Sequence, residues 1–133
     1  MLASLRPECR SANLGPVALR CLIVDDSEEF LASARRLLSA QGVAVVGVAS
    51  SGVEAVRLAE ELLPDVALVD VELGEEDGIE VARRLAECVP SSRVVLISSH
   101  PEDELGDLLV GNTAAGFLSK TELSAAAIAK LVG

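Results

Sequence analysis

The sequence predicts an α/β protein: a doubly wound, five-stranded parallel sheet with five helices, arranged as a three-layer sandwich. Short apolar runs that end at turn residues alternate with segments whose apolar residues recur at helical spacing, and this order repeats five times. The hydrophobic residues make up 50% of the chain and are mainly Leu, Val and Ala, whereas only 2% are aromatic. Strict alternation of strand and helix implies a parallel sheet that is covered by helices on both faces.

Five apolar runs are predicted to form the strands. Each is rich in Val, Leu, Ile or Ala and is bounded by residues typical of turns. The runs span Leu19 to Val24, Val43 to Ala49, Val66 to Asp70, Arg93 to Ser98 and Ala115 to Ser119.

The first two helices carry start and stop signals. Ser27 is the expected N-cap of the first helix, and Gly42 lies just beyond its end. Ser51 and Glu54 have the spacing of a capping box for the second helix, which Pro64 stops. The residues expected to be buried are Phe30, Ala34, Leu37 and Leu38 in the first helix and Ala55, Leu58, Ala59 and Leu62 in the second.

The other three helices follow the same pattern. Asp77 is the expected cap of a helix that begins near Gly78, Pro101 suits the first turn of the fourth, and Thr121 is the expected cap of the last. The residues expected to be buried are Ala82, Leu85 and Ala86, then Leu105, Leu108 and Leu109, then Leu123, Ala127, Ile128 and Leu131.

Length and composition limit the function. A chain of 133 residues predicts one domain, here residues 19–133, after an aperiodic segment at 1–18 that we expect to be a flexible extension. The net charge of -10 argues against direct binding of nucleic acid by this chain, because phosphate backbones select basic surfaces. Cys9, Cys21 and Cys88 are an odd number without metal-type spacing, so no disulfide framework is expected. No apolar run approaches the ~18 residues of a membrane span and no signal peptide is apparent, so we expect a cytoplasmic protein without membrane contact.

Polar residues collect where the predicted strands end. The first strand is followed by Asp25 and Asp26, the third ends at Asp70, the fourth ends at Ser98, and the fifth is followed by Lys120. Right-handed crossovers bring these ends to one edge of the sheet, where open α/β sheets bind ligands. Two carboxylates a few ångströms apart repel by about 4 kcal/mol at an effective dielectric of 20, so three together raise a pKa or recruit a cation. All-oxygen ligands suit Mg²⁺.

With these residues in place, the sequence resembles the receiver domain of two-component response regulators, including the single-domain chemotaxis type. The resemblance runs from about Leu19 to the C-terminus. It rests on the Asp pair, the Asp that ends the third strand, the Asp77-Gly78 pair, the hydroxyl that ends the fourth strand and the Lys after the fifth. It implies a flavodoxin-like fold with strand order 2-1-3-4-5.

The resemblance also implies roles for individual residues. Asp70 would be the phosphoacceptor for a phosphohistidine on a sensor histidine kinase or phosphotransfer protein. The side chains of Asp26 and Asp70 and the backbone carbonyl of Glu72 would bind Mg²⁺, and Asp25 would act through a metal-bound water. The residues expected to respond to the phosphoryl group are Ser98, which would hydrogen-bond one of its oxygens, Lys120, which would pair with another, and Phe117, the switch aromatic.

Three positions depart from the family pattern or vary within it. Gly74 stands where Pro is frequent, so that loop is expected to be less rigid. Glu72 and His100 occupy positions that flank the path of hydrolytic water in the family. We hypothesise that these two residues set the lifetime of the phosphoryl group, although a solvated loop histidine is an equally good interpretation of His100.

The sequence is compatible with several interpretations of the whole protein. Phosphorylation would change the surface made by the fourth helix, fifth strand and fifth helix, which is a candidate for an unknown output partner or a homodimer. The chain would then act through a protein partner, as a relay intermediate, or as the receiver part of a longer DNA-binding regulator. The alternatives are a phosphorylation-independent binding or dimerisation module and, less in keeping with the residues, a Mg²⁺-dependent phosphatase of the haloacid-dehalogenase type, whose nucleophile lies on the first strand.

Overall fold

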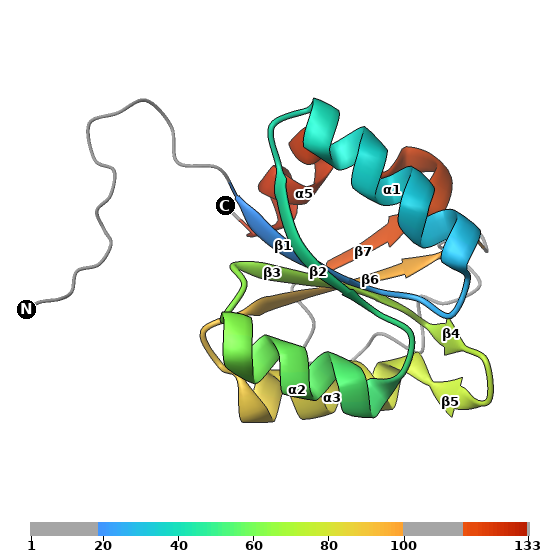
Figure 1. The fold of residues 1–133 in the computed structure, drawn as a ribbon, viewed down its shortest axis with the longest axis vertical. Helices are drawn as coiled ribbons and strands as arrows, with labels where there is room; N and C mark the ends of the chain where they lie inside the picture. The colour runs from blue at the N-terminus through green and yellow to red at the C-terminus, as the bar shows by residue number, and fades with distance from the viewer. Residues whose placement is uncertain (1–18, 100–115, 133) are drawn as a thin grey trace, which may run out of the picture.

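The computed structural model describes residues 19–99 and 116–132, and these form one parallel sheet between two layers of helices (Figure 1). The sheet contains β1 (Arg20–Val24), β2 (Ala44–Ala49), β3 (Val66–Asp70), β6 (Arg93–Ser98) and β7 (Gly116–Ser119). Its order is β2-β1-β3-β6-β7 and all pairs are parallel, which confirms the predicted order 2-1-3-4-5.

Among the described residues, two helices lie on each face of the sheet (Figure 1). On one face lie α1 (Glu28–Ala40) and α5 (Ala125–Val132), and on the other lie α2 (Gly52–Leu62) and α3 (Gly78–Cys88). The three-layer sandwich is therefore confirmed. The predicted helix after Pro101, together with His100 and the extension at 1–18, lies outside the described residues, and the proposed domain boundary stays a prediction.

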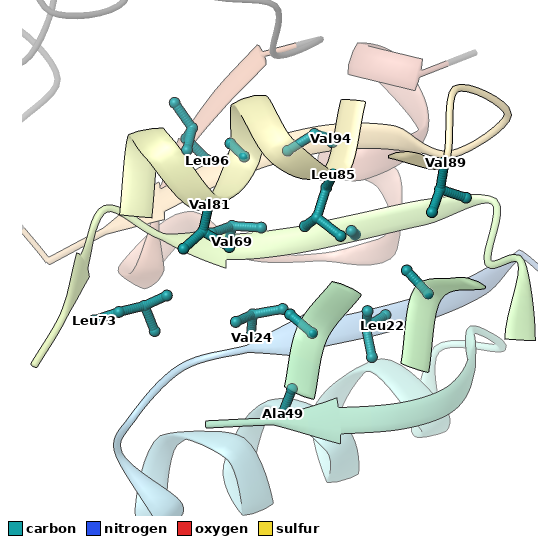
Figure 2. Close-up of a cluster of buried hydrophobic side chains, with 14 of the residues drawn as sticks. Leu22, Val24, Ala49, Val69, Leu73, Val81, Leu85, Val89, Val94 and Leu96 are labelled. Atoms are coloured by element: carbon teal, nitrogen blue, oxygen red, sulfur yellow. The ribbon is translucent and has the colours of Figure 1, made fainter. Parts of the chain in front are cut away.

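Between their polar end residues, the central strands are apolar because both of their faces are covered. Alternate residues of β1, β3 and β6 contribute to two separate cores. The core under α2 and α3 takes Leu22, Val24, Ala67, Val69, Val94 and Leu96, several of which are drawn in Figure 2. The core under α1 and α5 takes Cys21, Ile23, Val66, Leu68, Val95 and Ile97.

Most of the predicted helix ends are confirmed. The hydroxyl of Ser27 accepts from Phe30 N at 3.2 Å, and that of Ser51 accepts from Glu54 N at 3.3 Å. Asp77 Oδ1 accepts from Ile79 N at 3.0 Å and so caps α3. The capping box is shifted by one residue, because Glu54 Oε1 accepts from the backbone N of Ser50, at 3.0 Å.

Two expectations about the helices were wrong. Leu37 is 41% exposed, and Leu31 is buried in its place, because the phase of α1 turns the stripe of Leu31, Ala34 and Leu38 toward the sheet. Thr121 does not cap the last helix. A 3₁₀ turn, η1 (Lys120–Glu122), intervenes, and Ser124 Oγ accepts from Ala127 N at 3.0 Å to cap α5.

The loop after β3 contains an element that the sequence did not suggest. Two short antiparallel strands, β4 (Glu72–Leu73) and β5 (Glu76–Asp77), form a hairpin between Asp70 and α3. Glu76 Oε1 accepts from Gly52 N at 2.8 Å, so this hairpin is joined to the first turn of α2. The segment that follows the acceptor candidate is therefore tied to two helices.

The described residues include two cysteines. Cys21 is buried and Cys88 exposed, and both are free thiols. Burial raises the pKa of the Cys21 thiol to about 12.

Within residues 19–99 and 116–132, every helix is too short or too polar to cross a membrane.

Candidate phosphoacceptor site

The polar residues predicted from the strand ends do meet at one edge of the sheet. Asp25 follows β1, Asp70 is the last residue of β3, and Lys120 follows β7. The backbone ladder continues to this edge, where Asp25 N donates to Ala49 O at 3.0 Å and Val71 N donates to Ile97 O at 3.0 Å. The hydrogen bonds of the sheet therefore fix the backbone positions from which these side chains extend.

Asp25, Asp70 and Lys120 form a largely buried ion cluster, which we call the site cluster. Lys120 Nζ lies 2.6 Å from Asp25 Oδ2 and 3.1 Å from Asp70 Oδ2. The side chains are 0% exposed for Asp25, 8% for Asp70 and 18% for Lys120. One ammonium is thus shared by two desolvated carboxylates that lie on neighbouring strands.

Backbone amides hold the other oxygen of each carboxylate. Ser27 N donates to Asp25 Oδ1 at 2.8 Å, and Glu72 N donates to Asp70 Oδ1 at 3.0 Å. Both bonds span two residues, as in the Asx turns that Asp favours after a strand. The two carboxylates are therefore held in place from the loops that follow their strands and present their Oδ2 atoms to Lys120.

The electrostatics of the site cluster follow from burial. Desolvation, with the charge of Asp25 added, raises the pKa of Asp70 in spite of its contacts with Glu72 N and Lys120. Burial alone would lower the pKa of Lys120, but its close contact with the Asp25 carboxylate and the charge of Asp70 outweigh burial and raise that pKa. The ammonium is therefore held in its charged form beside a carboxylate that is costly to keep ionised.

The third carboxylate, Asp26, completes a set of oxygens that fits a small divalent cation. Ligand atoms of Asp25, Asp26 and Asp70 lie within 4.8 Å of one another, and Asp26 is exposed. Asp25 Oδ2 is fully buried and receives no hydrogen bond of regular geometry, so the nearby Lys120 ammonium is its charge partner. An all-oxygen, partly hydrated set of this kind suits Mg²⁺.

An open cleft gives access to these groups. Its volume is about 500 Å³, and polar groups dominate its wall. The lining residues are Asp25, Asp26, Ser27, Asp70, Val71, Glu72, Gly74, Glu76, Ser99 and Lys120. A phosphoryl group and a hydrated ion can therefore both reach the Asp70 carboxylate from solvent.

Two positions in the loop after β3 are occupied by glycine for steric reasons. A Cβ on Gly78 would lie 1.8 Å from the backbone O of Asp70, so only glycine allows α3 to begin this close to the acceptor candidate. Gly74 has φ +59°, which Pro cannot adopt, and a Cβ there would lie 3.2 Å from Asp26 Oδ2. The departure from Pro at this position is thus explained by the backbone of this loop.

The other predicted site residues are less tightly gathered. Ser98 is fully buried at the end of β6, one residue before Ser99 in the cleft wall. Phe117 in β7 is half-buried against the core under α2 and α3. The Glu72 side chain is exposed at the start of the hairpin, and His100 lies outside the described residues.

One residue near the site was assigned by sequence reasoning to the core alone. The ring of Phe30 lies with its centroid 4.3 Å from Lys120 Nζ. Its position four residues after Asp26, in the first turn of the helix that follows the Asp pair, is the signal that would have drawn attention to it. Contact across 90 residues of sequence depends on how α1 packs and cannot be deduced from that spacing.

Comparison with known sequences identifies the family. The family model described as "Response regulator receiver domain" matches residues 21–132. The chain therefore belongs to the response regulator receiver domain family. Receiver domains are signalling domains and not conventional enzymes, and the family binds Mg²⁺ at its acidic pocket.

The curated relatives that the chain matches include response regulators. The chain is 37% identical over 103 residues to the response regulator GacA of Pseudomonas viridiflava, and the alignment covers 77% of this chain and 48% of GacA. It is 34% identical to UvrY of Escherichia coli K12, with 77% and 47% covered, and 34% identical to the transcriptional regulatory protein LiaR of Bacillus subtilis 168, with 80% and 51% covered. The chain spans about half the length of the curated relatives it matches.

Solved structures agree with this assignment. The signal receiver domain of NarL from Mycobacterium tuberculosis superposes with a TM-score of 0.77 at 36% identity, covering 89% of this chain and 99% of that one. A LuxR-family two-component response regulator from Aurantimonas sp. SI85-9A1 gives a TM-score of 0.78 at 27% identity, with 87% and 86% covered.

Proposed function

We propose that this chain accepts a phosphoryl group on Asp70 from a phosphohistidine of a sensor histidine kinase or phosphotransfer protein, in a Mg²⁺-dependent reaction. The observation that supports this most is the site cluster. A half-buried ammonium placed 3.1 Å from one Asp70 oxygen, in a cleft open to solvent, is an arrangement that suits an incoming dianionic phosphoryl group.

The reaction would be a transfer between two nucleophiles. A carboxylate oxygen of Asp70 attacks phosphorus, an O–P bond forms and the N–P bond of phosphohistidine breaks. The imidazole leaves with the electron pair of that bond and takes up a proton. The product is a mixed anhydride on Asp70, whose phosphoryl oxygens come within reach of the Lys120 ammonium.

The metal site would use the residues around the acceptor. Asp26 and Asp70 would bind Mg²⁺ through their side chains, Glu72 would offer its backbone carbonyl, and Asp25 would act through a water. When bound, Mg²⁺ supplies charge neutralisation for the transferring phosphoryl group. The ability of Asp25 Oδ2 to accept another donor supports the water-mediated role.

Signalling would follow from the phosphorylated state. The Ser98 hydroxyl would move to donate to a phosphoryl oxygen, and Phe117 would turn inward into the space this leaves. The surface changed in this way includes β7 and α5, and it would bind an output protein or a second copy of the chain. The chain spans about half the length of its relatives. The proposal therefore includes a longer parent protein with a DNA-binding part.

The duration of the signal would depend on the groups beside the acceptor. We keep the hypothesis that Glu72 and His100 set the phosphoryl lifetime. Exchange of both residues for small neutral ones is expected to change the rate of phosphoryl loss. An unchanged rate would remove them from the proposal.

Intact-mass measurement after incubation with acetyl phosphate tests the central step. Wild-type protein with Mg²⁺ is expected to gain one phosphoryl group, and omission of Mg²⁺ or the Asp70→Asn substitution is expected to abolish the adduct. Glu80→Gln, which removes an exposed acid from α3, is the matched control and should be modified like wild type. A folded wild-type protein that gains nothing would favour the phosphorylation-independent binding module.

A further inference from the structure

Lys120 is contacted on a third side by an aromatic ring. The Phe30 centroid lies 4.3 Å from Lys120 Nζ, well inside the range of about 6 Å for a cation–π contact. The same ammonium lies 2.6 Å and 3.1 Å from the two carboxylates of the site cluster. Phe30 is one of only two aromatic residues in the whole chain.

The position of the ring is fixed from the Asp25 side. Ser27 N donates to Asp25 Oδ1 at 2.8 Å, and Ser27 Oγ accepts from Phe30 N at 3.2 Å. The ring is also packed against the core under α1 and α5. One short segment therefore places both a carboxylate and a ring around the same ammonium.

The ring and the carboxylates act on the ammonium in different ways. A carboxylate takes up one of the three N–H donors of lysine, whereas a ring face attracts the whole cation through its quadrupole. Asp70 Oδ2 accepts one of these donors, and the Asp25 carboxylate lies beside the ammonium as an ion-pair partner. The ring can therefore stabilise a desolvated ammonium without supplying another acceptor oxygen that would compete with a phosphoryl group.

We propose that Phe30 is a positioning residue that holds the Lys120 ammonium beside Asp70, ready for a phosphoryl oxygen. The contact between the Phe30 ring and the Lys120 ammonium is supported by the geometry alone. Its consequence for transfer rests on the function proposed above. An aliphatic side chain of similar size would fill the same space beside α1 but would lack the ring face.

Lysine-selective NMR tests the contact directly. The chain has only two lysines, Lys120 and the exposed Lys130 on α5, so protein labelled with ¹³C,¹⁵N-lysine gives one signal from the site and one internal reference. The ring is expected to shift the Lys120 ε-protons upfield of those of Lys130. The Phe30→Tyr variant should keep this shift, whereas Phe30→Leu and Phe30→Met should lose it with the Lys130 signal unchanged.

Phosphorylation kinetics test the consequence. With acetyl phosphate and Mg²⁺, the two ringless variants are expected to be modified about threefold to tenfold more slowly than wild type, and Phe30→Tyr to recover most of the rate. If Phe30 acted only by packing, the Phe30→Leu and Phe30→Met variants would instead be modified as fast as Phe30→Tyr. Agreement between the two ringless variants, each with wild-type backbone spectra, separates loss of the ring from loss of the fold.

The outcomes separate the two proposals. If wild-type protein takes no phosphoryl group, the proposed function is contradicted, while the ε-proton shifts still decide whether the ring holds the ammonium. If wild-type protein is modified but the ringless variants match it in rate, or Phe30→Tyr is as slow as they are, the positioning role of Phe30 is wrong. An unshifted Lys120 signal in wild type would overturn the inference altogether.

Discussion

Two clusters in this molecule each place one basic side chain between two carboxylates, and they differ in almost everything else. The site cluster joins Asp25, Asp70 and Lys120 from three strand ends, and its members are 0% to 18% exposed. On α3, Arg83 pairs with Glu80 and Glu87, and all three side chains are 49% to 63% exposed. We call these last three residues the helix cluster.

The difference shows what each arrangement is able to do. The helix cluster follows from i,i+3 and i,i+4 spacing on one helix, and surface pairs of this kind contribute little to stability because solvent screens them. The site cluster needs the whole fold to assemble it, and desolvation makes it costly. A costly arrangement at an open cleft is the pattern of a functional site, so the two clusters should respond very differently to the same changes.

Removal of the basic residue should separate the clusters most clearly. Lys120→Met leaves two desolvated carboxylates without their counter-charge, so we expect the free energy of unfolding to fall by about 3 kcal/mol at neutral pH without metal. Arg83→Met, the same type of change on α3, should leave it close to wild type. Urea denaturation measures both. Equal losses in the two variants would contradict the comparison.

Magnesium should stabilise the protein through the site carboxylates alone. At a free concentration of 100 times the Kd, binding to the folded state raises the free energy of unfolding by about 2.7 kcal/mol. The increment should shrink in Asp26→Asn and persist in Glu87→Gln, which removes an acid from the helix cluster. Thermal or urea unfolding with and without Mg²⁺ measures it, and an increment that survives in Asp26→Asn would place the ion elsewhere.

Acidification should change the contributions of the two clusters to the free energy of unfolding in opposite directions. The pKa of Asp70 is raised by burial, so its ionised form lowers stability above that pKa, and the penalty is relieved as pH falls through it. Asp70→Asn is therefore expected to be more stable than wild type at pH 7, by a margin that narrows on acidification.

Glu80 provides the opposite case. Its hydrogen bond with Arg83 lowers its pKa, so its contribution is present above the unfolded pKa and is lost as pH falls through the lowered value. Glu80→Gln should be slightly less stable than wild type at neutral pH and should converge with it in acid. Denaturant titrations over a pH series test both signs, and the same sign for both variants would break the comparison.

Salt should give the smallest effect. At about 1 M ionic strength the Debye length falls to about 3 Å, which screens exposed charges far more than buried ones. Any difference between wild type and Arg83→Met should vanish there, whereas the difference for Lys120→Met should largely remain. If salt removes the Lys120→Met difference as well, the site cluster is more hydrated than its burial indicates.

Much of the site was predictable because strand ends and helix caps are local signals. Asp25, Asp70 and Lys120 stand at the ends of apolar runs, and parallel pairing alone brings such ends together. Ser27 and Asp77 were recognisable as caps for the same reason. The family resemblance then supplied the strand order and the roles of the site residues.

Other features depend on packing and were not predictable. Leu31 replaces Leu37 in the core because the phase of α1 is set by the sheet and not by the spacing of leucines. The β4–β5 hairpin is too short to show a period, and the Ser124 cap follows a 3₁₀ turn that has no clear sequence signal. The contact of Phe30 with Lys120 requires both ends of the chain to be in place.

The most direct test of the account is the location of the phosphoryl group. Borohydride reduces an aspartyl phosphate to homoserine, so protein modified with acetyl phosphate and Mg²⁺ can be reduced, digested and sequenced by mass spectrometry. We predict homoserine at position 70 and unmodified acids in the helix cluster. Reduction at another carboxylate, or at none in a folded and Mg²⁺-loaded protein, would contradict the claim that the site cluster exists to make Asp70 a phosphoacceptor.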